Sequence, residues 1–278
     1  MSRPENAGPP ELFYDESEAA KYTSNSHIIS VQSEMADRAL ELLALPDDEP
    51  ALLLDIGCGS GLSGDVLSDA GHQWIGVDIS SAMLKTAQED RNVSGDLILK
   101  DMGHGLCFRP GTFDGAISIS AIQWLCHANS RDQSPRKRLL RFFQSLYGCL
   151  GRGARAVFQF YPETNGQSDL ITDQAIKAGF SGGLVVDYPN STKAKKIYLV
   201  LMTGGIRQLP KALTSDDGER KCVSNVGRRV FNVPRKGKEK LKKGSKAWIE
   251  MKKERAKRKG KEVHETSKYT GRKRKRLF

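Results

Sequence analysis

The chain has 278 residues, of which 38% are hydrophobic and 28% charged, and its formal net charge is +11. This length fits one large domain, or a domain with a tail, and the apolar content is sufficient for a core. No apolar run approaches the roughly 20 residues that cross a membrane, and the first residues lack the apolar segment of a signal peptide. These features argue against a membrane partner and against secretion.

The charge is divided unevenly along the chain. Residues 1–204 carry 18 Lys/Arg and 25 Asp/Glu, a net charge of −7, whereas residues 205–278 carry 26 and 8, a net charge of +18. A mildly acidic body with a strongly basic tail indicates a polyanionic partner, with nucleic acid as the first candidate. The alternative is a solvated tail that only aids solubility.

The cysteines show no metal or disulfide pattern. They stand at positions 58, 107, 126, 149 and 222 and include no C-x-x-C pair. Scattered thiols of this kind are typical of a reducing compartment such as the cytosol or nucleus, and we predict no metal site.

The N-terminal segment, residues 1–50, is predicted to form a helical cap. Residues 1–10 are polar and rich in Pro and Gly, and apolar residues at helical spacing follow over 17–22 and 28–45. Helices ahead of the first strand suggest a cap beside the loop that follows this strand. Three aromatic residues of the segment could cover a ligand or simply pack there: Phe13, Tyr14 and Tyr22.

Residues 51–204 alternate between strand and helix patterns. Strands are expected over 51–56, 73–78, 95–100, 113–119, 154–161, 183–188 and 195–203, and helices near 61–70, 80–90, 136–150 and 167–178. The clearest helix, 136–150, has one apolar stripe and Gly151 as its expected stop. Such alternation predicts a doubly wound, mostly parallel α/β sheet. Only Pro189–Ser191 joins the last two strands, too few residues for a crossover helix, so these strands should pair antiparallel.

The basic tail, residues 205–278, lacks the pattern of a folded domain. Residues 205–227 are polar and aperiodic, and residues 228–278 hold 22 Lys/Arg against 5 Asp/Glu. We expect this part to be largely disordered or to fold on binding, with 245–262 able to form a basic helix. The run 271–276 resembles a nuclear-import cluster.

The stretch 52–61 combines an apolar run, an acid and three glycines at alternate positions. Glycines at such a strand-to-helix turn let a ligand lie directly against the backbone. The dinucleotide fingerprint G-x-G-x-x-G/A would require a small residue where this chain has leucine. The spacing D-x-G-x-G-x-G, on Asp55, Gly57, Gly59 and Gly61, instead resembles motif I of class I S-adenosylmethionine-dependent methyltransferases. In that class the turn wraps the methionine end of the cofactor, and the acid acts through the loop and the amino group.

Acids end the first three predicted strands: Asp55, Asp78 and Asp101. In open α/β sheets ligands bind at the carboxyl ends of the strands, so the three side chains should share one site. Asp78 stands 17 positions after Gly61 and is placed to accept hydrogen bonds from the ribose hydroxyls of an adenosine. A nicotinamide enzyme would have an acid at the same place. An acidic pocket favours a cationic sulfonium and repels the pyrophosphate of NAD, so we predict S-adenosylmethionine as the cofactor.

The resemblance to methyltransferases implies further cofactor contacts. Asp101 resembles the acid that meets the adenine amino group in this class. Its neighbour Met102, together with Ile79 and the strand residue Ser118, completes the expected cofactor site. Each acid alone is more often a helix cap or a turn former, so the prediction depends on their occurrence together beside the glycine turn.

The segment after the fourth strand, residues 118–125, bears on the substrate. It reads Ser-Ile-Ser-Ala-Ile-Gln-Trp-Leu, without the Asn/Asp-Pro-Pro-aromatic turn of adenine-N6 and cytosine-N4 methyltransferases, and no cysteine has the proline-cysteine context of pyrimidine C5 enzymes. A ring nitrogen with a free lone pair, such as guanine N7, needs neither device. Trp124 and Tyr161 follow the fourth and fifth strands, where a flipped base could stack, although Trp124 could equally be a buried core residue.

Segments across nearly the whole chain resemble one particular family. They are residues 9–16, 54–64, 118–125, 178–183, 185–191 and 269–275. On these segments the chain resembles the eukaryotic small-subunit (18S) rRNA guanine-N7 methyltransferases. The resemblance implies a seven-stranded sheet with its last strand antiparallel, methylation of one guanosine in small-subunit rRNA, and a role in subunit maturation and export. It also implies residence in the nucleus, in nucleoplasm and nucleolus, with the cytoplasm as a further location.

The same resemblance implies a heterodimer with a small zinc-binding activator protein that several methyltransferases share. In this fold the third strand, 95–100, lies at the edge of the sheet and exposes backbone beside apolar side chains. Such an edge invites strand addition by a partner, unless the chain's own loops cover it.

Two rival functions stay open from the sequence. One is a methyltransferase of the same fold that acts on a small molecule or a protein, with the tail serving as an address label. The other is a ribosome-assembly factor that uses the domain as an RNA-binding scaffold, independently of methylation.

Overall fold

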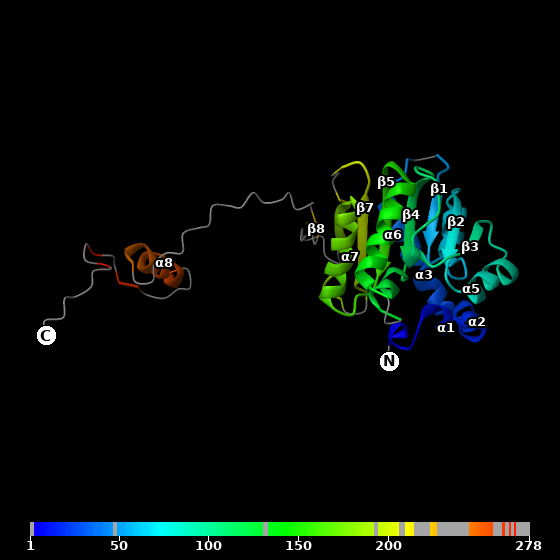
Figure 1. Ribbon diagram of the computed structural model, residues 1–278, viewed down its shortest axis with the longest axis horizontal. Helices are drawn as coiled ribbons and strands as arrows, with labels where there is room; N and C mark the ends of the chain where they lie inside the picture. Colours follow the sequence, from blue (N-terminus) through cyan, green and yellow to red (C-terminus); the bar gives the residue numbers. More distant parts are fainter. Residues whose placement is uncertain are drawn as a thin grey trace. The chain divides into compact units, whose positions relative to one another are not determined.

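The computed structural model describes residues 3–46, 49–129, 133–191, 194–205, 209–213, 223–226, 245–257, 263–264, 267 and 270. The chain divides into two compact units, Met1–Arg228 and Arg229–Phe278, which are described separately (Figure 1). No helix in the described part of the chain is long and apolar enough to cross a membrane.

The first unit is built on one eight-stranded sheet (Figure 1). Its strands are β1 (Leu52–Ile56), β2 (Gln73–Asp78), β3 (Asp96–Leu99), β4 (Phe113–Ile119), β5 (Leu150–Phe160), β6 (Ser181–Asp187), β7 (Lys196–Met202) and β8 (Val223–Val226), in the order β3-β2-β1-β4-β5-β7-β6-β8. The neighbouring strands β3, β2, β1, β4 and β5 pair in parallel, and β7 is antiparallel to both β5 and β6. The doubly wound sheet with an antiparallel β7 is therefore confirmed.

Helices cover both faces of the sheet. They are α1 (Pro10–Phe13), α2 (Glu16–Ser24), α3 (Ser26–Leu43), α4 (Leu62–Asp69), α5 (Ser81–Lys85), α6 (Pro135–Cys149) and α7 (Asn165–Ala178), with a π-helical turn η2 (Thr86–Asp90) and short 3-10 turns η1 (Pro4–Asn6), η3 (Met102–His104) and η4 (Ile122–Cys126). Side chains alternate along β1, so Leu54 packs into the core that α6 and α7 cover and Leu53 into the core beneath α3 and α4. This sandwich fixes the strand ends, on which the site depends.

Three local features differ from the sequence expectations. Helix α6 ends at Cys149 and β5 begins at the next residue, so Gly151 lies in the strand instead of stopping the helix. The predicted helix 80–90 changes to a π-helical turn after Lys85. Strand β8 falls in the stretch 205–227, where no strand was expected, because it joins the sheet through backbone pairing with β6 and has no apolar alternation to reveal it.

The second unit contains helix α8 (Lys246–Lys257), which confirms the basic helix over that part of 245–262. Lys252 Nζ lies 4.5 Å from the centre of the Trp248 ring. Residues 258–262, the cluster 271–276 and most of the tail whose disorder the sequence predicts lie outside the described residues.

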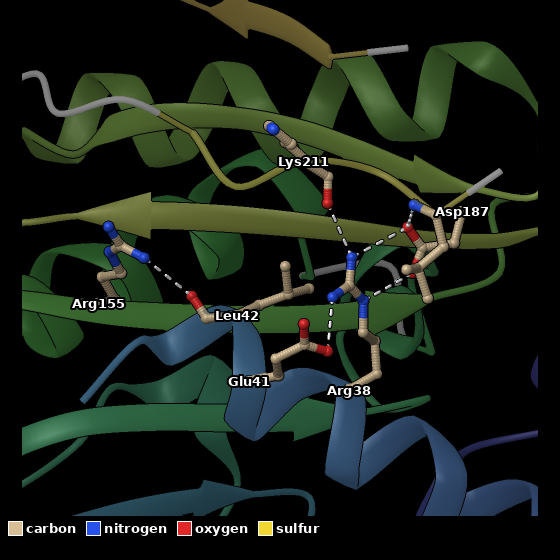
Figure 2. Close-up of polar contacts among 7 residues, drawn as sticks. Arg38, Glu41, Leu42, Arg155, Asp187 and Lys211 are labelled. Carbon is tan, nitrogen blue, oxygen red and sulfur yellow. Dashed lines mark hydrogen bonds and ion pairs between the residues drawn. The ribbon is translucent and has the colours of Figure 1, made fainter. Parts of the chain in front are cut away.

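Within the first unit, a buried ion pair between α3 and β6 binds the segment 209–213 (Figure 2). Arg38 of α3 and Asp187 of β6 are 9% and 2% exposed, and the Arg38 Nε donates to Asp187 at 2.9 Å. The same guanidinium donates to the Lys211 carbonyl at 2.9 Å, and Asp187 accepts the Leu213 N–H at 2.8 Å. The compact unit therefore continues past residue 204, where the sequence pattern of the domain stops.

Replacing Asp187 by Ala should lower the free energy of unfolding by about 3 kcal/mol, because it leaves the Arg38 charge buried without its main partner. Urea denaturation measures this loss. The matched control is Glu41→Gln, since Glu41 binds the same guanidinium at 2.6 Å but is 68% exposed, and it should cost less than about 1 kcal/mol. Equal losses in the two variants would contradict a special role for the buried pair.

Candidate active site

The glycine turn between β1 and α4 is held in a backbone conformation that L side chains rarely adopt. Gly57 has φ +73°, and a Cβ there would lie 2.3 Å from the Cβ of Ala121. Gly61 has φ +82°, and a Cβ there would lie 2.6 Å from the Val93 side chain. Any larger residue at either position would push the turn away from the strand ends, so glycine is required by close approach as well as by conformation.

Asp78 at the end of β2 organises this turn. Its carboxylate accepts the Gly59 N–H at 2.9 Å and the Ser80 N–H at 2.8 Å. Burial raises the pKa of this carboxyl, whereas the backbone N–H groups that it accepts act in the opposite direction. Asp78 also lines a cavity beside the turn, so its remaining lone pairs are available to a ligand.

Asp55 at the end of β1 lies beneath the turn and is fully buried. One oxygen accepts the Ser63 hydroxyl at 2.6 Å, and the other has no partner among the described residues. Burial raises the pKa of this carboxyl to about 7, against the opposing effect of the Ser63 hydrogen bond. Asp55 thus holds the start of α4 in place and leaves one buried acceptor oxygen unused.

The cavity has a volume of about 920 Å³, counted to its open mouth, and lies at the carboxyl ends of the strands. Of the residues predicted from the sequence, seven line it: Gly57, Gly59, Asp78, Ile79, Asp101, Met102 and Trp124. Four do not line it: Asp55, Gly61, Ser118 and Tyr161. Asp55 and Gly61 act on the turn from behind, so most of the predicted set converges on one place.

Ser118 and Tyr161 lie away from the cavity wall. Ser118 is fully buried in β4, and its hydroxyl has no partner in the described part of the chain. Tyr161 donates its hydroxyl to the Met35 sulfur at 3.3 Å and accepts from Lys196 at 2.8 Å. These contacts give Tyr161 a structural role between β5, α3 and β7.

The N-terminal cap closes one side of the cavity. Tyr14 and Tyr22 line it, and the Tyr14 ring lies 5.9 Å from the ring of Trp124. The Ser80 hydroxyl donates to the Tyr14 carbonyl at 2.8 Å, which ties the cap to the start of α5. Arg3 donates to the Tyr161 carbonyl at 2.8 Å, which ties the cap to the end of β5. The predicted cap beside the glycine turn is thus present.

Trp124 stands on η4, four positions after a strained residue. Ser120 has φ +57°, unusual for a residue with a side chain, and its hydroxyl hydrogen-bonds Gln159 at 2.7 Å. Trp124 is 7% exposed, mostly packed and partly presented to the cavity. Strain of this kind persists where surrounding contacts fix a functional position.

Arg138 of α6 is a cavity residue that sequence reasoning missed. Its guanidinium forms two hydrogen bonds with Asp101, at 2.8 and 2.9 Å, and both side chains are largely buried. Gly103 makes room for it, since a Cβ there would lie 2.4 Å from the Arg138 Nε. The two residues are 37 positions apart, and no local spacing announces their contact; only the run of cations in α6 without an acid set this helix apart.

The cavity fits S-adenosylmethionine. Asp78 and Asp101 share the cavity lining with apolar residues that include Val77 and Met83. Backbone at the glycine turn can approach a ligand closely because no side chain intervenes. When bound, the cofactor supplies an electrophilic methyl group on a positively charged sulfur. Fold and site together define a class I S-adenosylmethionine-dependent methyltransferase.

Comparison with known proteins narrows this class. Two family models match, "Methyltransferase domain" over residues 54–158 and "Methyltransferase involved in Williams-Beuren syndrome" over residues 201–276. Proteins named 18S rRNA (guanine-N(7))-methyltransferase from Mus musculus, Arabidopsis thaliana and Schizosaccharomyces pombe are 55%, 53% and 48% identical to this chain. These alignments cover 99–100% of this chain and 98–100% of each relative. The chain belongs to the family of 18S rRNA (guanine-N7)-methyltransferases.

Solved structures agree on the fold. Magnesium protoporphyrin IX methyltransferase from Synechocystis, with its cofactor bound, superposes with a TM-score of 0.53 at 16% identity over 73% of this chain and 98% of that one. A phosphoethanolamine N-methyltransferase from Haemonchus contortus gives a TM-score of 0.52 at 16% identity, over 74% of this chain and 61% of that one. S-adenosylmethionine is the methyl donor of this chain.

The buried Asp55 should make stability depend on pH. Its carboxyl holds a proton up to about pH 7 in the folded chain but only to about pH 4 when unfolded, so the folded chain binds more protons between these values. The free energy of unfolding therefore falls as pH rises through this window. Relative to Asp55→Asn, the wild-type chain without cofactor should lose about 2–3 kcal/mol between pH 5 and 7.5 in chemical denaturation. Parallel pH profiles for the two chains would contradict the uptake of a proton by Asp55 on folding.

Proposed function

We propose that the chain transfers the methyl group of S-adenosylmethionine to N7 of a guanosine in 18S rRNA. The observation that carries the proposal is identity of 48–55% over the full length of relatives that bear this name. Agreement over 98–100% of each relative includes the basic region after the sheet as well as the methyltransferase unit.

The chemistry of the site supports N7 as the acceptor. The guanine N7 lone pair forms the new N–C bond while the methyl–sulfur bond breaks, so positive charge passes from sulfur to the purine and no proton moves. The protein then needs to align three atoms and exclude water. Cys58, a thiol on the cavity wall, is 4% exposed, and burial raises its pKa, so it is poorly suited to the thiolate attack of C5 methylation.

The cap and η4 supply the surfaces that a guanine would use. Trp124 and Tyr14 are aromatic residues of the cavity lining, which also includes the amide residues Asn129 and Gln32. A flipped base stacks on aromatic faces and is oriented by hydrogen bonds to its edges. We assign base positioning to Trp124; Tyr161, set back from the cavity, would act only through the elements that it joins.

The basic tail would bind the rRNA. Residues 205–278 carry a net charge of +18, and phosphate contacts give affinity with little sequence choice. The target's own fold and its place in the pre-ribosome would then choose the guanosine. A role in maturation and export of the small subunit, and residence in the nucleus, follow from the family resemblance and from the basic run 271–276.

Mass-spectrometric mapping of N7-methylguanosine in small-subunit rRNA tests the function. Cells that carry Asp78→Ala in place of the wild-type chain should lose one methylated site, because Asp78 joins the glycine turn to the cofactor pocket. Calorimetry on the purified variant checks that cofactor binding is lost while the chain stays folded. An unchanged map with cofactor binding lost would favour a small-molecule or protein substrate. Normal subunit maturation without the methyl group would favour the assembly-factor role.

We also propose a heterodimer with a small zinc-binding activator protein. Strand β3 lies at the edge of the sheet, and Leu99 on it is 59% exposed. An exposed edge beside an apolar side chain suits strand addition, in which backbone hydrogen bonds give affinity and side-chain pockets give specificity. This edge is our candidate interface.

Replacing Leu99 by Asp should weaken this association at least tenfold, because it places a charge where the partner would cover an apolar side chain. Co-purification and titration with the partner measure the effect. The control is Leu12→Asp, which also changes an exposed leucine, 73% exposed on the cap and away from β3. Equal affinity of the wild-type chain and the Leu99 variant would refute the β3 interface.

A further inference from the structure

Helix α6 carries a charge pattern that does not stabilise the helix. Its first two turns hold Arg136, Lys137, Arg138 and Arg141, and its whole length contains no acid. Cations near a helix N-terminus oppose the macrodipole and so destabilise the helix. The buried side chains that pack α6 on the sheet are apolar and include none of these cations. The cations therefore call for an explanation outside the stability of the helix.

One of the four is engaged by the protein. Arg138 is 12% exposed and paired with Asp101, so its charge is neutralised inside the cavity wall. Arg136, Lys137 and Arg141 are exposed, and no ion pair of theirs occurs in the described part of the chain. Three cations of one helix are thus left facing solvent, in a unit whose first 204 residues carry a net charge of −7.

Two of these cations adjoin Arg138, a residue of the cavity wall. Arg138 lines the cavity, and Lys137 and Arg141 are one turn apart on the helix surface that flanks it. The Arg141 stem lies against the turn after β3, 3.6 Å from where a Cβ of Gly105 would stand. Lys100, at the end of β3, is on the cavity wall itself. A basic rim therefore adjoins an acidic cofactor pocket.

We propose that Arg136, Lys137 and Arg141 form a phosphate-binding surface that holds the backbone of the RNA beside the target guanosine. The inference rests on the proposed rRNA substrate and adds a second contact to that of the tail. Exposed Arg and Lys side chains suit phosphate oxygens, and such contacts fix the position of a nucleic acid without reading its sequence. The α6 surface thereby positions the backbone, and the cavity receives the base.

The test uses the full chain and unmodified 18S rRNA, with binding measured over a range of salt concentrations. A triple variant, Arg136→Gln, Lys137→Gln and Arg141→Gln, should weaken binding at least tenfold at low salt. It should also lower the slope of log affinity against log salt by about 2–3, since each phosphate contact contributes about 0.7–0.9. Affinity for S-adenosylmethionine should stay unchanged, which shows that the variant is folded.

A matched control removes three exposed cations near the amino ends of the strands, at the end of the sheet opposite the cavity: Arg109→Gln, Arg152→Gln and Lys177→Gln. It should leave the salt slope within experimental error of wild type. Arg138→Gln, in the same helix, should lower cofactor affinity and leave the slope unchanged, because Asp101 already neutralises that charge.

Equal salt slopes for the α6 triple variant and the wild-type chain would refute the proposed phosphate-binding surface, even with methylation of 18S rRNA intact. Equal slope losses in the α6 variant and the control would overturn it too, since binding would then follow net charge alone. Failure of the wild-type chain to methylate 18S rRNA would instead refute the proposed function, so the two failures are distinguishable.

Discussion

The Asp78 carboxylate is the constraint on which the site depends. It accepts backbone N–H groups from both the glycine turn, at Gly59, and the start of α5, at Ser80. Ser80 in turn donates its hydroxyl to the Tyr14 carbonyl, so the cap is fixed to the same strand end. A buried carboxylate needs such donors, because desolvation alone would favour its neutral form. One side chain thus aligns three chain segments that are far apart in sequence.

Charge is sorted by depth around the cavity. The Asp78 carboxylate lies on the cavity wall at the strand ends, where a cationic cofactor gains from it, whereas exposed cations stand on α6. Arg138 lies at the boundary and pairs with Asp101. Because the two kinds of charge are separated, the acid can attract the sulfonium of the cofactor while the cations attract the phosphates of the RNA.

Two kinds of feature could be predicted from the sequence: strands marked by a repeating apolar pattern, and residues that lie together at the ends of parallel strands. Alternating apolar patterns located β1 to β7, and the rule that parallel strands end together brought Asp78 and Asp101 to one cavity. Features that depend on one contact between residues far apart in the chain could not be predicted. Strand β8 joins by backbone pairing alone, and the contact of Arg138 with Asp101 depends on where α6 packs. Ser118 lies in the predicted strand β4 but does not line the cavity.

The ion pair of Arg38 and Asp187 helps to hold residues 209–213 against the sheet, beside the packing of Leu209 in the core. Arg38 donates to the Lys211 carbonyl (Figure 2), and Asp187 accepts the Leu213 N–H, so the pair gives partners to two backbone groups of this segment. Arg155 similarly donates to the Leu42 carbonyl in the last turn of α3, where helix carbonyls lack internal partners. An apolar replacement could match the packing but not these hydrogen bonds. Because α3 also contributes Gln32 to the cavity lining, the helix that binds this segment through Arg38 is also part of the site.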